Sequence, residues 1–192
     1  MKNARSPARE AVIREREALA ATTSLGVGAT WAGALYWVFV GAYLAWRGTH
    51  RGSLAVVLVA GMLLVYPIGY ALTRAAGGDL LARRHPWGGI VRTLWVTEFV
   101  GWPILGVLWI QAPHLVVFGL AASLGMHFIP FAWLYRFGPY AALAVWSVLG
   151  ACFAQVFLAA HASRVIPIGM SLGYALAAIA AHRTIHAMRK RA

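Results

Sequence analysis

The 192-residue sequence has few acidic residues and almost no cysteine: five Asp and Glu together, and one Cys. With Cys152 alone, no disulfide can form within the chain. The sequence also lacks zinc-ligand spacing, a Walker loop, a Rossmann fingerprint and a Gly-x-Ser-x-Gly elbow. These absences argue against the commonest zinc, nucleotide and serine-nucleophile enzymes, and we expect neither a metal nor a cofactor.

Charged residues of either sign are also scarce. They make up 11% of the chain, whereas 61% is hydrophobic and the mean hydropathy is +0.69. A soluble domain has about 25% charged residues, so this composition predicts an integral membrane protein. A helix needs about 20 apolar residues to cross a hydrocarbon core. Six runs of that kind occur, at about 24–46, 53–73, 89–110, 115–135, 139–160 and 165–186.

The predicted fold is all-α, with six transmembrane helices in one bundle and short loops between them. Pro113 divides the long apolar stretch 89–135, so the third and fourth spans should form an antiparallel hairpin. Ser6 and Pro7 favour a helix start, and residues 7–21 are expected to form a short cytoplasmic or interfacial helix. We therefore divide the chain into a cytoplasmic N-terminal segment 1–23, a transmembrane domain 24–186 and a basic cytoplasmic tail 187–192.

The net charge of +12 would suggest nucleic acid in a soluble protein, but the basic residues follow the membrane topology instead. Of the 17 Lys and Arg residues, only Arg47, Arg51 and Arg164 fall at the ends of spans opposite the two termini. This asymmetry is the positive-inside pattern of an inner-membrane protein. It predicts cytoplasmic termini, the lipid bilayer with anionic lipids at its cytoplasmic face as partner, and no nucleic acid.

The stretch LWVTEFVGWPILGVLW, residues 94–109, contains the only acidic residue inside a span, Glu98. An ionised carboxylate at that depth costs free energy unless it is paired with another group, neutralised or hydrated, so Glu98 is a functional candidate. Glu98 lies 15 residues before Pro113 and His127 lies 14 after it. At ~1.5 Å of rise per residue, the two side chains should lie at nearly the same depth on adjacent helices.

Other polar and aromatic residues are expected in the same layer. The candidates for ligand binding or proton chemistry are Glu98, His127, Tyr66, Tyr70, Trp95, Trp102 and Ser147. Two interpretations stay open. The Glu98/His127 pair is either a proton-active couple lined by aromatic rings or a buried polar pair that only holds two helices in register.

Small residues at helical spacing predict close helix packing in two spans. Gly119 and Ser123 lie on one face of the fourth span. In the sixth span, Gly169, Gly173 and Ala177 follow one another every four residues. This smooth face could meet a helix of the same chain or of another copy, so a homo-oligomer through the sixth span is one expectation.

The segment GMHFIPFAWLYRFGPY, residues 125–140, resembles a family of small bacterial six-span membrane proteins of unknown function. PIGYALTR at 67–74 and HPWGG at 85–89 are similar to further segments of that family. The sequence departs from the family at Glu98, where the resemblance implies an uncharged polar residue, and at Arg136. The residues that match the motif are His127, Pro130, Trp133, Leu134, Tyr135 and Tyr140.

Three classes of function are compatible with the sequence. The favoured one is a small transporter or ligand-binding bundle that takes a small cationic or apolar ligand at the polar layer. The alternative is a noncatalytic membrane partner or oligomeric channel subunit, in which the Glu98/His127 pair is structural. A membrane-embedded lipid-modifying enzyme is the least favoured, because a second carboxylate, a metal triad and a nucleophile with its base are all missing.

Overall fold

The structure, a computed structural model, describes residues 6–190, and this part of the chain is helical with no strand. Within it, six helical segments are long and apolar enough to cross a membrane. The chain is therefore a multi-pass integral membrane protein. The six segments overlap the six predicted spans; they are Ser24–Arg47, Arg51–Ala75, Gly88–Gln111, Pro113–Leu134, Gly138–Phe157 and Ala159–Arg189.

The first helix, α1 (Pro7–Thr22), confirms the short helix predicted before the first span. The side chain of Ser6 caps it by accepting a hydrogen bond from the backbone N–H of Arg9. The spans contain the remaining helices: α2 (Val27–Arg47), α3 (Arg51–Ala75), α4 (Gly88–Val100), α5 (Trp102–Gln111), α6 (Val116–Met126), α7 (Phe128–Leu134), α8 (Gly138–Phe157) and α9 (Ala162–Arg189).

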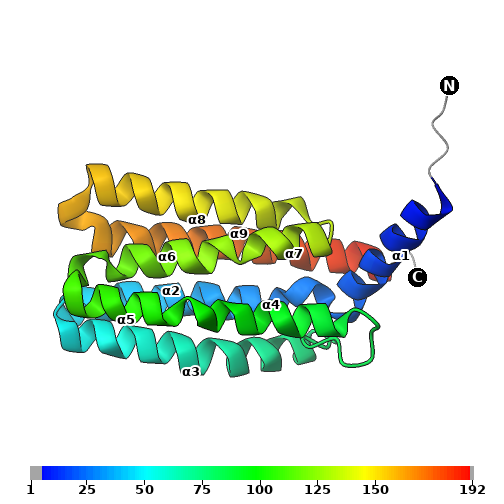
Figure 1. Cartoon of the computed structure of the whole chain (residues 1–192), viewed down its shortest axis with the longest axis horizontal. Coiled ribbons are helices and arrows are strands. Elements are labelled where there is room, and N and C mark those ends of the chain that lie inside the picture. Colours follow the sequence, from blue (N-terminus) through cyan, green and yellow to red (C-terminus); the bar gives the residue numbers. More distant parts are fainter. Residues whose placement is uncertain (1–5, 191–192) are drawn as a thin grey trace.

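The span helices run side by side along the long axis of an elongated bundle (Figure 1). Helix α2 is central, because it packs closely against both α3 and α9, and its Trp37 and Val40 are fully buried. Helix α4 lies at the periphery, and its main helix contact is with α5, its own continuation. The core is thus formed around α2, while the helix that carries Glu98 is held more loosely.

The backbones of α2 and α3 touch at two glycines. A Cβ added to Gly28 would lie 2.0 Å from the backbone nitrogen of Thr73, and one added to Gly69 would lie 2.8 Å from the Cα of Ala29. Neither position has room for a side chain. These glycines let α2 and α3 approach as closely as small residues allow in membrane helices.

The third and fourth spans are both interrupted near the middle. The third breaks at Gly101, between α4 and α5, and the fourth breaks at His127, between α6 and α7. Pro103 and Pro130 follow the breaks, and neither has a backbone N–H to continue the helical ladder. Glu98 lies in the last turn of α4, so both interruptions lie beside the Glu98/His127 pair.

Helix α1 docks on the bundle through Arg16 and Glu17. The Arg16 guanidinium donates to the carbonyl oxygens of Trp133 and Leu134 and lies 4.5 Å from the centre of a Trp133 ring. Burial, and then the charge of Arg136, lower the pKa of Arg16 from its usual value. Glu17 accepts a hydrogen bond of 2.8 Å from Arg136. The N-terminal helix is thereby attached to the end of the fourth span.

Several of the small residues expected at helix contacts have close neighbours within the chain. A Cβ on Gly119 would lie 2.5 Å from the Leu108 side chain, and one on Gly101 would lie 3.0 Å from Ser123 Oγ. In α9, Gly173 faces the Trp146 ring, whose Nε1 donates to the carbonyl oxygen of Gly169 at 2.9 Å. The stripe on α9 that includes the buried Ala177 therefore meets α8. Contact with a second copy through α9 stays a prediction.

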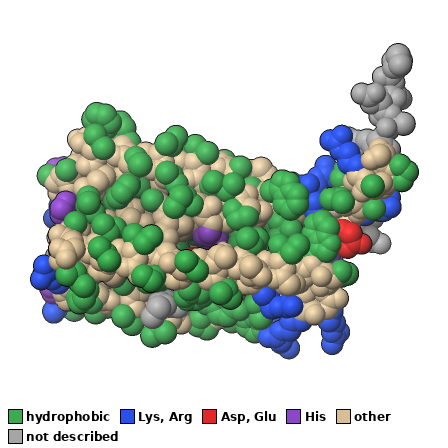
Figure 2. All heavy atoms as spheres, viewed as in Figure 1, with side chains coloured by type: hydrophobic (Ala, Val, Ile, Leu, Met, Phe, Trp, Pro, Cys, Tyr) green, Lys and Arg blue, Asp and Glu red, His purple; other side chains and the backbone are tan. Residues whose placement is uncertain are grey.

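The surface separates charge from apolar side chains. In Figure 2 the basic side chains gather at the α1 end, a smaller group lies at the opposite end, and the body between them is covered mainly by hydrophobic side chains. Lys2, Arg5 and Arg191, which belong to the basic asymmetry of the sequence, lie outside the described residues. An apolar body with charge at its two ends matches the layers of a bilayer.

Candidate functional site

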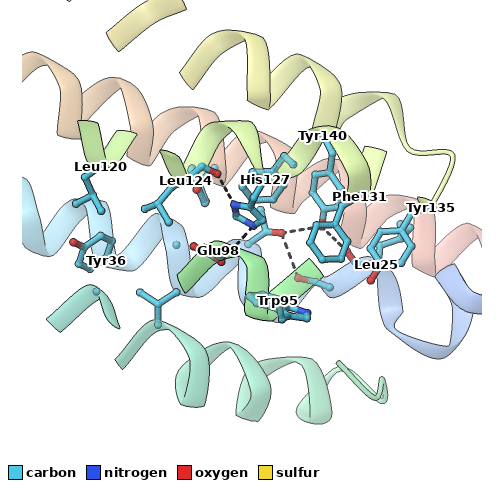
Figure 3. Close-up of a pocket in the computed structure, with 18 of the residues that line it drawn as sticks. Leu25, Tyr36, Trp95, Glu98, Leu120, Leu124, His127, Phe131, Tyr135 and Tyr140 are labelled. Carbon is cyan, nitrogen blue, oxygen red and sulfur yellow. Dashed lines mark hydrogen bonds and ion pairs between the residues drawn. The ribbon is translucent and has the colours of Figure 1, made fainter. Parts of the chain in front are cut away.

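A cavity of about 60 Å³ lies inside the bundle beside Glu98 and His127 (Figure 3). Because one water needs roughly 10–15 Å³ of such space, the cavity can hold a few waters or a small ion. All six spans contribute to its lining. Its aromatic lining residues are Tyr36, Trp95, Trp102, Phe128, Phe131, Tyr135, Tyr140 and Tyr174.

Glu98 and His127 face each other at the cavity. Glu98 Oε2 lies 3.9 Å from His127 Nε2, and each side chain is 15% exposed. On the other side of the ring, Nδ1 lies 2.6 Å from the carbonyl oxygen of Leu124 (Figure 3). This is the proximity expected from the distances of the two residues to Pro113.

The Leu124 contact determines which nitrogen of His127 carries hydrogen. A carbonyl oxygen only accepts, so Nδ1 must be the donor, and in a neutral ring Nε2 then presents a lone pair to Glu98. An ionised Glu98 would be repelled by that lone pair. Nε2 therefore faces Glu98 as an acceptor in the neutral ring and would face it as a donor in the doubly protonated ring.

Aromatic rings surround the imidazole of His127. Phe128 lies 4.3 Å away between ring centroids, Phe131 meets it edge-on at 5.8 Å, and Trp95 lies 6.2 Å away. Trp95 in turn packs edge-on against Tyr66 at 5.6 Å. Its indole N–H is buried and has no acceptor among residues 6–190. The walls thus offer ring faces and, on Trp95, a buried donor that has no acceptor among residues 6–190.

Two tyrosine hydroxyls of the lining are already occupied by the protein. Tyr36 donates to the carbonyl oxygen of Val57 at 3.0 Å. Tyr140 donates to the carbonyl oxygen of Leu25, so its own oxygen accepts from Thr30 Oγ1 at 2.8 Å. These rings remain as apolar, electron-rich surfaces, which leaves the Glu98/His127 pair as the main polar feature of the cavity.

Depth alone did not identify every lining residue. Trp95, Glu98, Trp102 and His127 line the cavity, whereas Tyr66 lies behind Trp95 at an adjoining hollow of about 30 Å³.

Two further residues of the predicted layer, Tyr70 and Ser147, lie outside this cavity. Tyr70 does not line the cavity, because its hydroxyl lies 3.5 Å from Arg74 and its ring lies under Arg83. Ser147 is fully buried against Gly125, at the crossing of α6 and α8. The predicted layer also omits Tyr36 and Tyr174. Their mid-span positions are the signal that could have singled them out, and equal depth does not specify which way a helix face points.

Five of the six motif residues, all except Pro130, divide between the cavity and the α1 contact. His127, Tyr135 and Tyr140 line the cavity. Leu134 is buried, and Trp133 is 59% exposed and carries Arg16 on its ring. The segment 127–140 therefore contributes both to the lining of the cavity and to the surface on which α1 docks.

Comparison with known families gives one match. The model of DUF7010, a family of unknown function, covers residues 13–184. The chain belongs to this family. No curated protein and no solved structure matches it. The matched part of this DUF7010 protein includes all the residues that line the cavity, but membership assigns no activity, so the function has to be argued from the cavity itself.

Proposed function

We propose that this protein binds a small organic cation in the cavity at Glu98 and exchanges it for a proton across the membrane. The observation that carries the proposal is the Glu98/His127 pair in an aromatic-walled cavity. Glu98 is the only acidic residue within the six spans. An ionisable residue at that depth is by default part of an ion, proton or substrate pathway.

The lining favours a cation over an anion. Aromatic faces carry partial negative charge, and a cation within about 6 Å of a ring centre is attracted by it. Trp95 and Trp102 stand on the same side of the cavity as the carboxylate. An anion would meet both the ring faces and Glu98 with like charge, so a small ammonium group is the complementary ligand.

In this proposal the pair holds one proton when no cation is bound, and that proton supplies the coupling. A cation beside Glu98 balances the charge of the carboxylate. The proton shared with His127 is then released. Because an uncompensated charge in the bundle is costly, the site holds either the proton or the cation. One cation is then exchanged for one proton.

The interrupted spans give the site a means of opening. Breaks at Gly101 and His127 leave α4 and α7 as half-helices, both of which run between the pair and the α1 end of the bundle (Figure 1). Broken helices at mid-membrane recur in transporters, where one part rocks against a fixed site. The peripheral packing of α4 makes it the part that moves.

A binding measurement tests the proposal. Purified protein in nanodiscs is titrated with methylammonium and with tetramethylammonium by calorimetry at several pH values. If one proton leaves for each cation, affinity should rise by about tenfold per pH unit while the pair holds its proton. Glu98→Gln should abolish both the binding and its pH dependence, and Glu17→Gln, which removes an exposed acid outside the spans, should change neither.

The opposite result has a clear meaning. If wild type and Glu98→Gln bind neither amine at any pH and Glu98→Gln only lowers thermal stability, the pair is a structural contact. The noncatalytic partner role would then replace the present proposal.

A further inference from the structure

A second hollow of about 360 Å³ lies between α3 and α4, on the outside of the bundle. Apart from one arginine, its lining is apolar or aromatic. Val96 and Leu63 are 63% and 58% exposed, so the hollow opens to the surroundings of the bundle. We name it the α3–α4 groove; the apolar side chains that α3 and α4 contribute are Leu63, Tyr66, Pro67, Trp95, Val96 and Phe99.

In a bilayer this groove is filled with hydrocarbon. It lies along two spans, where water finds few polar partners, and α3 and α4 do not close it by packing on each other. Its walls are the kind of surface that an acyl chain covers. The apolar part by itself selects no particular lipid.

Positive charge at one end of the groove provides the selectivity among lipids. Arg92 lines the groove and is six residues before Glu98, which places it about 9 Å nearer the α1 end of the bundle. The Arg92 Nη1 group donates to the carbonyl oxygen of Leu81 at 3.5 Å, and the side chain is otherwise exposed. A guanidinium has five N–H donors, so several remain to bind a phosphate.

Neighbouring residues strengthen the positive charge there. Arg83 and Arg84 lie in the connection between α3 and α4, and both are exposed. The acid of the same connection, Asp79, is engaged by its own backbone, because its carboxylate accepts from the N–H groups of Leu81 and Arg83 at 3.2 and 2.8 Å. In Figure 2 basic side chains cluster at this end of the bundle beside hydrophobic ones.

We propose that the α3–α4 groove is a binding site for an anionic phospholipid. One acyl chain lies along Leu63, Val96 and Phe99, and the phosphate is bound by Arg92 with Arg83 or Arg84. Trp95 and Tyr66 separate this chain from the cavity at Glu98, so the lipid covers the outer side of the aromatic wall. The site does not depend on what the cavity binds.

Lipid retention tests this site. Protein is reconstituted in phosphatidylcholine with or without phosphatidylglycerol, extracted in mild detergent and examined by native mass spectrometry and thermal unfolding. Wild type should retain phosphatidylglycerol in preference to phosphatidylcholine and unfold at a higher temperature with it. Arg92→Gln should lower that retention by about fivefold. The matched control Arg164→Gln removes an exposed arginine from the other end of the bundle and should retain lipid as wild type does.

A second variant distinguishes lipid binding in the groove from nonspecific attraction of anionic lipid by the basic residues. Val96→Trp fills the groove, keeps every arginine and alters no buried contact, so it should also lose phosphatidylglycerol while remaining folded. Glu98→Gln should retain the lipid, which keeps this test apart from that of cation exchange.

Three results would overturn the site. They are equal retention of the two lipids, equal losses in Arg92→Gln and Arg164→Gln, and stabilisation by inorganic phosphate as large as that by phosphatidylglycerol.

Discussion

Glu98 Oε2 lies 3.9 Å from His127 Nε2, while the other ring nitrogen of His127 donates to the carbonyl oxygen of Leu124. The imidazole thus lies between a backbone acceptor and a carboxylate. Glu98 comes from the peripheral helix α4, and His127 comes from the junction of α6 and α7. This contact therefore joins the interruptions of two different spans.

The two residues should be energetically coupled. Alanine at either position leaves a polar partner stranded, which should lower the free energy of unfolding by ~1–3 kcal/mol. A double-mutant cycle of Glu98→Ala and His127→Ala in a detergent unfolding assay should give a coupling of at least ~0.5 kcal/mol. The control cycle pairs Glu98→Ala with Trp46→Ala, a highly exposed residue near the end of α2, and should be additive. Additivity in both cycles would mean that the observed proximity carries no interaction energy.

The aromatic wall should contribute to cation affinity. Trp102→Leu keeps an apolar side chain at the cavity but removes the ring face, so methylammonium affinity should fall by roughly tenfold or more, the effect of a desolvated cation–π contact. Trp46→Leu changes a tryptophan that is 76% exposed and should leave affinity unchanged. Calorimetric titration of both variants at one pH makes the comparison. Equal affinities in the two variants would show that the Trp102 ring does not contribute to cation binding.

The contact of α2 with α3 should not tolerate a methyl group. Gly28→Ala places a Cβ against the backbone of Thr73, and such overpacking typically costs ~1–3 kcal/mol of unfolding free energy. Gly106→Ala is the matched control, because its added Cβ meets nothing within 4 Å. The two midpoints of thermal or detergent unfolding should therefore differ clearly. If Gly28→Ala unfolds like Gly106→Ala, the two helices are farther apart than described.

The topology expected from the basic residues places both termini in the cytoplasm. Single cysteines at Ala8, Thr49 and Ala160, each exposed, are introduced in a background where Cys152 is replaced by alanine. An impermeant maleimide added to intact cells should label positions 49 and 160 and leave position 8 unlabelled until the cells are opened. Labelling of position 8 alone from outside would invert the topology.

Much of the architecture follows from local properties of the chain. A span is recognised from the length and hydropathy of one apolar run, because the bilayer imposes the same requirement on each run separately. The depth of Glu98 relative to His127 needs only Pro113 and a constant rise per residue. The start of helix α1 could likewise be predicted from its capping residue, Ser6. None of these inferences depends on which helices are neighbours.

Only the tertiary structure decided which residues form the cavity and which lie beside it. Rotation of a helix about its axis depends on the packing of every neighbour, so residues of equal depth can face different surroundings. Tyr36 and Tyr174 were thereby brought into the wall, while Tyr70 turned toward arginines and Ser147 into the crossing of α6 and α8. The sequence by itself determined how deep each side chain lies in the membrane, and the packing of six spans determined what each side chain meets there.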